Sequence, residues 1–275
     1  MTGHRLPFDV NCSILFTELP LLERPAAAKT AGFDAVEFWW PFAEPVPAER
    51  DVDAFVTAIG DAGVRLVGLN FFAGDMPAGD RGVLSWPGRE AEFRANADVV
   101  AGIGQVTGCR AFNALYGNRI AGEDTARQDD LAAESLAYAA RAVGEHGGVV
   151  LVEPVSGVAA YPLKTADDAV AVIDRVTADG GAGEVRLLAD LYHLSVNGVD
   201  LDDAIARHAH RVGHVQVADA PGRHQPGTGA LDVDGRLALL ERSGYTGWVG
   251  LEYVPAGPTA DSFDWLPRDR RAAGD

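Results

Sequence analysis

The sequence is poor in the residues that mark several common kinds of protein. Cysteine occurs twice in 275 residues, at Cys12 and Cys109, which is neither a disulfide framework nor a zinc-finger spacing. We expect both to be small buried side chains in strands. Lysine occurs only at Lys29 and Lys164. Neither lies at the end of an expected strand, which argues against a Schiff-base aldolase.

Positive charge is also scarce. The chain carries 23 Lys and Arg against 40 Asp and Glu, a formal net charge of -17. Because phosphate backbones are bound by basic surfaces, this balance argues against a nucleic-acid partner and against a DNA-repair endonuclease. No apolar run approaches the length of a membrane span, and the amino terminus has no apolar signal core. We therefore expect a cytoplasmic protein without a membrane partner.

The chain does contain a regular alternation of strands and helices. In a length near 250 residues, eight such strands are typical of a single (β/α)8 barrel, which we expect as one domain over 1–275 with a charged, Pro-rich tail from about 255. A doubly wound sheet usually carries a Gly-rich turn after its first strand, and residues 11–19 contain no glycine. The expected strands are 8–14, 35–40, 65–72, 109–116, 149–153, 185–190, 212–217 and 248–253, and the expected helices are 21–31, 52–62, 92–106, 124–145, one beginning at 165, 201–209 and 232–243.

Four of these strands carry an acid or an amide near their carboxyl ends: Glu153, Asp190, Gln216 and Glu252. In a barrel such ends meet in one mouth, so we expect the four side chains to converge. Three carboxylates crowded together without a cation would repel one another and take up protons. An all-oxygen set suits a hard divalent ion, Mg²⁺ or Mn²⁺, better than zinc. The alternative is that each acid pairs with an arginine.

Other polar residues are expected near the same mouth. His193, three residues after Asp190, could hydrogen-bond a substrate hydroxyl, or it is a satisfied histidine at the rim. Arg223, in the Gly-rich segment 222–229, could hold a carboxylate with two hydrogen bonds, or it lies in a plain surface loop. Glu37 could line the mouth or form a salt bridge. The long polar segment 73–87 has the length of a lid or binding loop.

The pattern resembles the hydroxypyruvate isomerase family of the xylose-isomerase-like barrels along nearly the whole chain. The resemblance implies that Glu153, Asp190, Gln216 and Glu252 hold the metal, and that Glu153 and Glu252 form the proton-transferring pair. The stretches that carry it are Phe8 to Phe16, Ala31 to Phe38, Ala73 to Asp75, Pro87 to Glu90, Leu151 to Pro154, Asp190 to His193, Gly213 to Gly229 and Gly244 to Tyr253.

Two positions depart from many hydroxypyruvate isomerases. Leu69 stands where they have histidine, and Val254 stands where they usually have lysine. The similar 2-oxo-tetronate isomerases also lack that histidine, and the run 17–20 resembles theirs. The resemblance therefore implies a small hydroxy-keto acid as the substrate, with either subfamily open. A sugar epimerase of the same superfamily is less favoured, because it usually has histidine at the position of Gln216. Since such barrels are often oligomeric, a homo-oligomer stays open.

The resemblance implies an aldose–ketose type isomerisation, hydroxypyruvate to tartronate semialdehyde, through a cis-enediolate stabilised by the metal. One of Glu153 and Glu252 would remove a carbon-bound proton, and the other would deliver it to the neighbouring carbon. A hydride shift is the alternative. A sugar-acid binding protein without activity is also open, and in that case Glu153→Gln would keep the ligand affinity.

Overall fold

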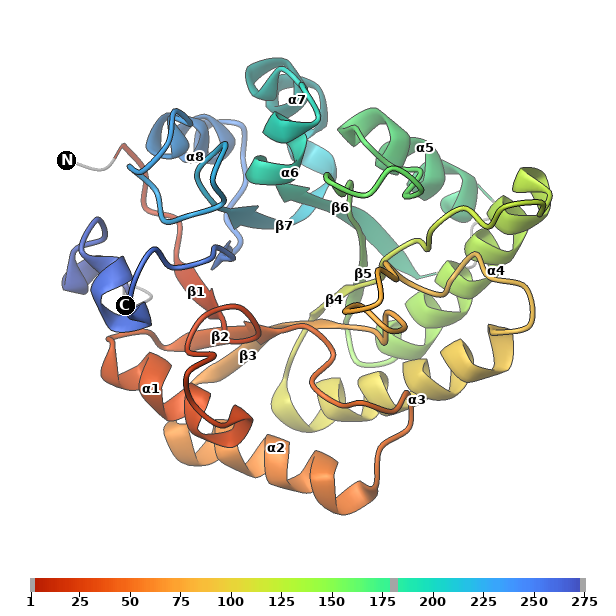
Figure 1. The fold of residues 1–275 in the computed structure, drawn as a ribbon, viewed down its shortest axis with the longest axis horizontal. Coiled ribbons are helices and arrows are strands. Elements are labelled where there is room, and N and C mark those ends of the chain that lie inside the picture. Colours follow the sequence, from red (N-terminus) through yellow and green to blue (C-terminus); the bar gives the residue numbers. More distant parts are fainter. Residues whose placement is uncertain (1–2, 179–182, 273–275) are drawn as a thin grey trace.

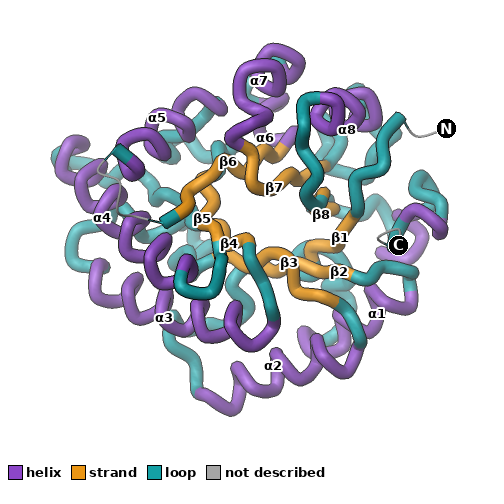
Figure 2. The backbone as a smooth tube through the Cα atoms, turned by 180° about the vertical axis from the view of Figure 1, so that it is seen from behind, coloured by secondary structure: helices purple, strands orange, loops and turns teal. Residues whose placement is uncertain are grey.

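The chain folds into a closed barrel of eight parallel strands in sequence order, surrounded by helices (Figure 1). The structure is a computed structural model and describes residues 3–178 and 183–272. Seen from behind, the strands form one ring inside the helices (Figure 2). The expected (β/α)8 barrel is confirmed, and no helix in the described ranges is long and apolar enough to cross a membrane.

Both kinds of element recur around the barrel. The strands are β1 (Phe8–Asn11), β2 (Ala35–Phe38), β3 (Arg65–Asn70), β4 (Ala111–Asn113), β5 (Val149–Val152), β6 (Glu184–Asp190), β7 (Val212–Val217) and β8 (Val249–Leu251). The α-helices are α1 (Arg24–Thr30), α2 (Glu49–Ala62), α3 (Glu90–Thr107), α4 (Thr125–Gly144), α5 (Ala166–Thr177), α6 (Leu191–Val196), α7 (Leu201–His208) and α8 (Val233–Arg242).

Local signals in the sequence fix most helix ends. Pro25 lies in the first turn of α1, where its missing N–H costs no hydrogen bond. Thr165 and Asp168 form the expected capping box at the start of α5. Gly63 ends α2 in the left-handed conformation that glycine adopts without strain, with φ 65°.

Six strands are shorter than the apolar runs suggested, and one helix was missed; the six are β1, β2, β3, β4, β5 and β8. β1 ends at Asn11 because the Asn11 side chain and carbonyl accept hydrogen bonds from the following turn, whose donors are the N–H groups of Ser13, Ile14 and Leu15. β3 and β4 likewise end early, at Asn70 and Asn113. Helix α6 was not expected and follows β6 at once.

The charged, Pro-rich segment after β8 packs against the body of the barrel. Phe263 is fully buried and contacts the aromatic rings of Phe16, Phe33 and Tyr253. The Thr259 hydroxyl accepts a hydrogen bond from the backbone N–H of Phe16. The segment after β8 therefore packs beside the turn that follows β1, on one side of the barrel (Figure 1).

Candidate active site

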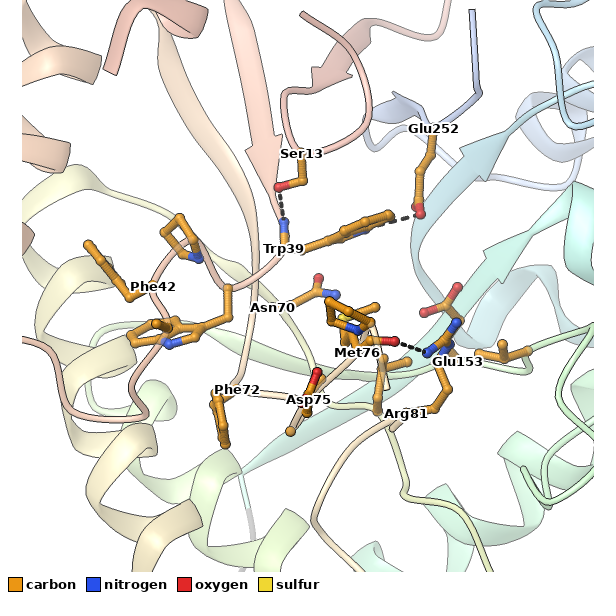
Figure 3. A pocket seen from close by; sticks show the side chains of 18 of the residues that line it. Ser13, Trp39, Phe42, Asn70, Phe72, Asp75, Met76, Arg81, Glu153 and Glu252 are labelled. Carbon is orange, nitrogen blue, oxygen red and sulfur yellow. Dashed lines mark hydrogen bonds between the residues drawn. The ribbon is translucent and has the colours of Figure 1, made fainter. Parts of the chain in front are cut away.

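A cavity of about 900 Å³ opens at the carboxyl ends of the strands. Four of the predicted residues line it: Glu153, His193, Arg223 and Glu252. Figure 3 shows Glu153 and Glu252 directed into the cavity from the strand side, with Trp39 and Asn70 beside them. The remaining two predicted residues, Asp190 and Gln216, are buried and do not form its wall.

Strand geometry explains how these side chains meet. Glu153 directly follows β5 and Glu252 directly follows β8. Asp190 is the last residue of β6, and Gln216 pairs with it in register on β7. Because adjacent parallel strands present paired residues to the same face, Asp190 and Gln216 lie side by side inside the barrel.

Two buried oxygens at this point have no hydrogen-bond partner. They are Oδ2 of Asp190 and Oε1 of Gln216. The other carboxyl oxygen of Asp190 caps α6, accepting from the N–H groups of Tyr192 and His193. A buried polar atom without a partner is costly, and a cation would satisfy both oxygens. The residues present therefore fit a divalent ion with oxygen ligands.

Glu153 belongs to the same group. Within the described residues, ligand atoms of Glu153, Asp190 and His193 all lie within 4.8 Å of one another, an arrangement that could hold a metal ion. Asn113 Nδ2 donates to Glu153 Oε2 over 2.6 Å. Burial and the Asp190 carboxylate raise the pKa of Glu153 to about 8, against the opposing effect of that hydrogen bond. This is the proton uptake expected of crowded carboxyl groups.

Glu252 has different partners at the other side of the cavity. Its Oε1 accepts from Trp39 Nε1 at 3.1 Å and from Arg223 at 2.8 Å (Figure 3 shows the first). Burial raises the pKa of Glu252 well above its ordinary value; Arg223 lowers it, and Glu153 raises it further. Glu153 and Glu252 thus face one cavity in two distinct environments.

The ring of His193 is held in one orientation. The backbone N–H of Ser156 donates to His193 Nδ1 at 3.1 Å, so Nδ1 is an acceptor and the neutral ring carries its proton on Nε2. Nε2 lies 3.7 Å from Asp190 and 3.9 Å from Glu153. Burial lowers the pKa of His193, which keeps the ring neutral. This tautomer suits a hydrogen bond donated to a substrate oxygen.

Arg223 is presented by a strained loop after β7. Its φ of 56° is unusual for a residue with a side chain, and such strain concentrates at functional sites. The guanidinium lies over the Tyr192 ring, and one nitrogen is engaged by Glu252. Its Nε is buried without a partner. Arg223 is therefore a half-buried cation at the cavity and not a plain surface residue.

Sequence reasoning missed a second cation, Arg81. It is the one basic residue of segment 73–87, which the structure confirms as an irregular loop beside the cavity. One guanidinium nitrogen donates to the carbonyls of Met76 and Asp80, at 3.1 and 2.6 Å. Arg81 and Glu153 both line the cavity (Figure 3). A single arginine in a long binding loop was the signal available in the sequence.

Glu37 and the two lysines lie away from the cavity wall. Glu37 is buried inside the barrel, where its carboxyl group hydrogen-bonds His214 at 2.6 Å, and it is not among the residues that line the cavity. Lys29 pairs with Asp34 outside the barrel. Lys164 donates to the carbonyl of Val158 at 2.6 Å. Neither lysine is among the lining residues, in keeping with the argument against a Schiff base.

The fold and this oxygen-lined mouth define a xylose isomerase-like barrel. A family model described as "Xylose isomerase-like TIM barrel" matches residues 25–268. A Streptomyces coelicolor protein named "Putative hydroxypyruvate isomerase" is 56% identical over 97% of both chains. The Escherichia coli "Hydroxypyruvate isomerase" is 31% identical, over 95% of this chain and 98% of its own. The chain belongs to the hydroxypyruvate isomerase family of these barrels.

Two further similarities bear on its place in that family. The Cupriavidus necator "2-oxo-tetronate isomerase" is 33% identical, over 94% of this chain and 96% of its own. A crystal structure described as AP endonuclease, family 2, from Brucella melitensis is 34% identical, with a TM-score of 0.86 over 95% of this chain and 98% of that one. That description belongs to the Brucella protein, and the net charge of -17 argues against nucleic acid as a ligand here.

Proposed function

We propose that the protein interconverts hydroxypyruvate and 2-hydroxy-3-oxopropanoate, with the help of Mg²⁺ or Mn²⁺. Membership in the family makes it an isomerase. The observation that carries the specific reaction is the pair of buried carboxyl groups, Glu153 and Glu252, that face one cavity from strand ends. A reaction that moves a proton between adjacent carbons needs one group to accept it and one to donate it.

Glu153, Asp190, Gln216 and Glu252 would hold the cation. A divalent ion in that place supplies positive charge that stabilises an oxyanion and favours the ionised forms of the glutamates. One glutamate removes a proton from the hydroxymethyl carbon of hydroxypyruvate, which leaves a cis-enediolate, and the other delivers a proton to the former carbonyl carbon. The proton of the former hydroxymethyl oxygen passes to the former carbonyl oxygen, so that the first becomes the aldehyde and the second the hydroxyl. His193 Nε2–H donates to a substrate oxygen, and Arg223 contacts the substrate carboxylate.

Isomerisation of 2-oxo-tetronate is the second candidate. The cavity of about 900 Å³ has room for an acid longer than three carbons. Leu69 and Val254, which depart from many hydroxypyruvate isomerases, also leave this substrate open. The two candidates share the proton-transferring pair and differ only in the length of the carbon chain.

A coupled assay on both substrates, with and without EDTA, tests the proposal. We expect turnover of hydroxypyruvate that is lost after exhaustive chelation and restored by Mg²⁺ or Mn²⁺. Full activity after chelation would remove the metal role. A higher kcat/KM for 2-oxo-tetronate would favour the second candidate, and no turnover of either acid would contradict both.

Arg81→Met is expected to raise the KM for hydroxypyruvate by roughly 10- to 100-fold, because a charge-assisted hydrogen bond contributes about 1.5–3 kcal/mol. The motivation is that Arg81 is a cation at the wall of the cavity that Glu153 also lines. Arg89→Met is the matched control, since Arg89 pairs with Glu92 and is outside the cavity lining. Equal KM values for the two variants would show that Arg81 does not contact the substrate.

A further inference from the structure

A connected set of hydrogen bonds lies inside the barrel, next to the proposed metal site. At its centre is the carboxyl group of Glu37, which is 3% exposed. Its Oε1 accepts from Gln216 Nε2 at 2.7 Å and from Asn11 Nδ2 at 3.0 Å. Its Oε2 pairs with His214 Nε2 at 2.6 Å. Glu37 on β2 thus reaches the side chains of β7, although β1 and β8 lie between these strands in the ring.

This set of contacts fixes which end of the Gln216 amide faces Glu37. The backbone N–H of Ser13 donates to Asn11 Oδ1, so the NH₂ group of Asn11 must point to Glu37. The Gln216 amide likewise presents its NH₂ group to the same carboxyl oxygen. Gln216 Oε1 is then directed away from Glu37, and it is one of the two buried oxygens without a partner described above.

Two glycines make room for the Glu37 carboxyl group. A Cβ at Gly250 on β8 would come within 2.6 Å of Glu37 Oε1, and a Cβ at Gly68 on β3 would come within 3.0 Å of Oε2. Real Cβ atoms essentially never approach a neighbour below 3.0 Å. Gly250 has no left-handed backbone conformation that would by itself require glycine. The absence of a side chain there therefore serves the position of Glu37.

The same carboxyl group is poorly placed to hold a cation of its own. Ligand atoms of Asp9, Glu37 and His214 lie within 4.8 Å of one another. Both oxygens of Glu37, however, already accept hydrogen bonds from three side chains. Burial and the neighbouring Glu37 raise the pKa of Asp9 well above its ordinary value, which favours its neutral form. Glu37 acts here as an acceptor for Gln216.

We propose that Glu37 is a positioning residue that holds the NH₂ group of Gln216 and thereby presents Gln216 Oε1 to the divalent cation. The inference rests on the metal site of the proposed function. Partners that orient a metal ligand without touching the metal typically contribute 10- to 100-fold in metal affinity. The closed barrel is essential to the arrangement, since it brings β2 and β7 within reach of one side chain.

Binding of Mn²⁺ alone, followed by electron paramagnetic resonance, tests the proposal without relying on turnover. Glu37→Met removes the acceptor at similar volume, and we expect it to raise the Mn²⁺ Kd by about 10- to 100-fold. Glu37→Gln keeps an acceptor oxygen for the Gln216 amide and is expected to bind Mn²⁺ nearly as wild type does. Gly250→Ala is a second route to the same loss, because its Cβ displaces the Glu37 carboxyl group.

An exchange of the two groups sharpens the test. In Gln216→Glu, two carboxyl oxygens face each other across the 2.7 Å contact, so we expect Mn²⁺ affinity to fall although a carboxylate is a good ligand. Adding Glu37→Gln to that variant restores a donor and an acceptor, and we expect the affinity to recover. Recovery in the double variant is the non-additivity expected of residues in direct contact.

The control is Asp9→Asn, an isosteric change in the same buried interior that leaves the Glu37–Gln216 contact intact. Wild-type Mn²⁺ affinity in Glu37→Met and Gly250→Ala would overturn the inference while leaving the metal site of the proposed function in place. A loss in Asp9→Asn as large as in Glu37→Met would also overturn it, because the effect would then come from general disruption of the interior. Failure of the wild-type protein to bind Mn²⁺ would contradict the metal site itself.

Discussion

Glu153→Gln and Glu252→Gln are each expected to lower kcat by about 10²- to 10⁴-fold, the range typical of a positioned acid or base. The amide keeps the size of the side chain and cannot exchange a proton with carbon. Both side chains are buried and line the cavity, so neither has a solvent molecule as a ready substitute. Turnover of hydroxypyruvate by the purified variants measures the effect.

Glu18→Gln is the matched control, because Glu18 is an exposed acid that hydrogen-bonds Thr259 outside the cavity lining. We expect it to leave kcat unchanged. Running the wild-type reaction in D₂O tests the roles of Glu153 and Glu252 independently, because it shows whether the product takes up hydrogen from solvent. Deuterium on carbon supports transfer through the glutamates, whereas none over many turnovers would favour a hydride shift. Near wild-type kcat in both cavity variants would refute the assigned roles.

Asp219→Ala is expected to lower kcat/KM by about 100-fold, because it lets Arg223 move relative to the substrate. A displacement of roughly 1 Å has an effect of this size. Asp219 is buried at the end of β7, and its carboxylate accepts from the N–H groups of four residues in the loop that carries Arg223. Without that acceptor, the loop loses its fixed shape. The donors are the backbone N–H groups of Ala220, Gly227, Gly229 and Leu231.

The same variant is expected to lose about 2 kcal/mol of unfolding free energy, because four half-buried backbone N–H groups lose their acceptor. Burial pushes the pKa of Asp219 up, but the four backbone N–H groups outweigh it and lower the pKa. Because the pKa of Asp219 is lower in the folded than in the unfolded protein, its ionised form stabilises the fold at pH values above the unfolded-state pKa. This contribution to the free energy of unfolding is lost as the pH falls through the folded-state pKa. Urea unfolding at about pH 7 and about pH 3 measures this. The difference in free energy of unfolding between wild type and Asp219→Ala is expected to be smaller at the lower pH.

Asp232→Ala is the control for the loop. Asp232 is exposed and caps α8 through the N–H of Gly235, so its loss is expected to cost about 1 kcal/mol with little change in kcat/KM. Equal kcat/KM for Asp219→Ala and Asp232→Ala would show that the four hydrogen bonds do not position Arg223.

Patterns along the chain were sufficient for most of the architecture. The alternation of apolar strands with helices predicts the barrel, and the capping box at Thr165 and Asp168 predicts the start of α5. Strand ends were harder to place, because a run such as 109–116 is apolar beyond the three residues that β4 pairs. Apolar character reports burial, whereas strand bounds depend on hydrogen bonds to neighbouring strands.

The site residues at the mouth of the barrel were predictable where they occupy the same place relative to their strands, at or just after the carboxyl end. Glu153 and Glu252 both follow the last residue of a strand, and the structure places both at one cavity. Arg81 was not predictable in the same way, because it belongs to an irregular loop whose path has no sequence period. Its place at the cavity wall follows from how the segment 73–87 packs over the barrel (Figure 3).

The sequence by itself determined the class of fold, the acidic character of the mouth and the identity of the carboxyl groups at the strand ends. Only the tertiary structure decided the hydrogen-bond partners of those groups. Trp39 and Arg223 meet at Glu252, and Glu37 meets Gln216, because closing the barrel brings together strands that are distant along the chain. A residue's neighbours across a closed barrel depend on register and on small side chains such as Gly250, neither of which is a local property of the sequence.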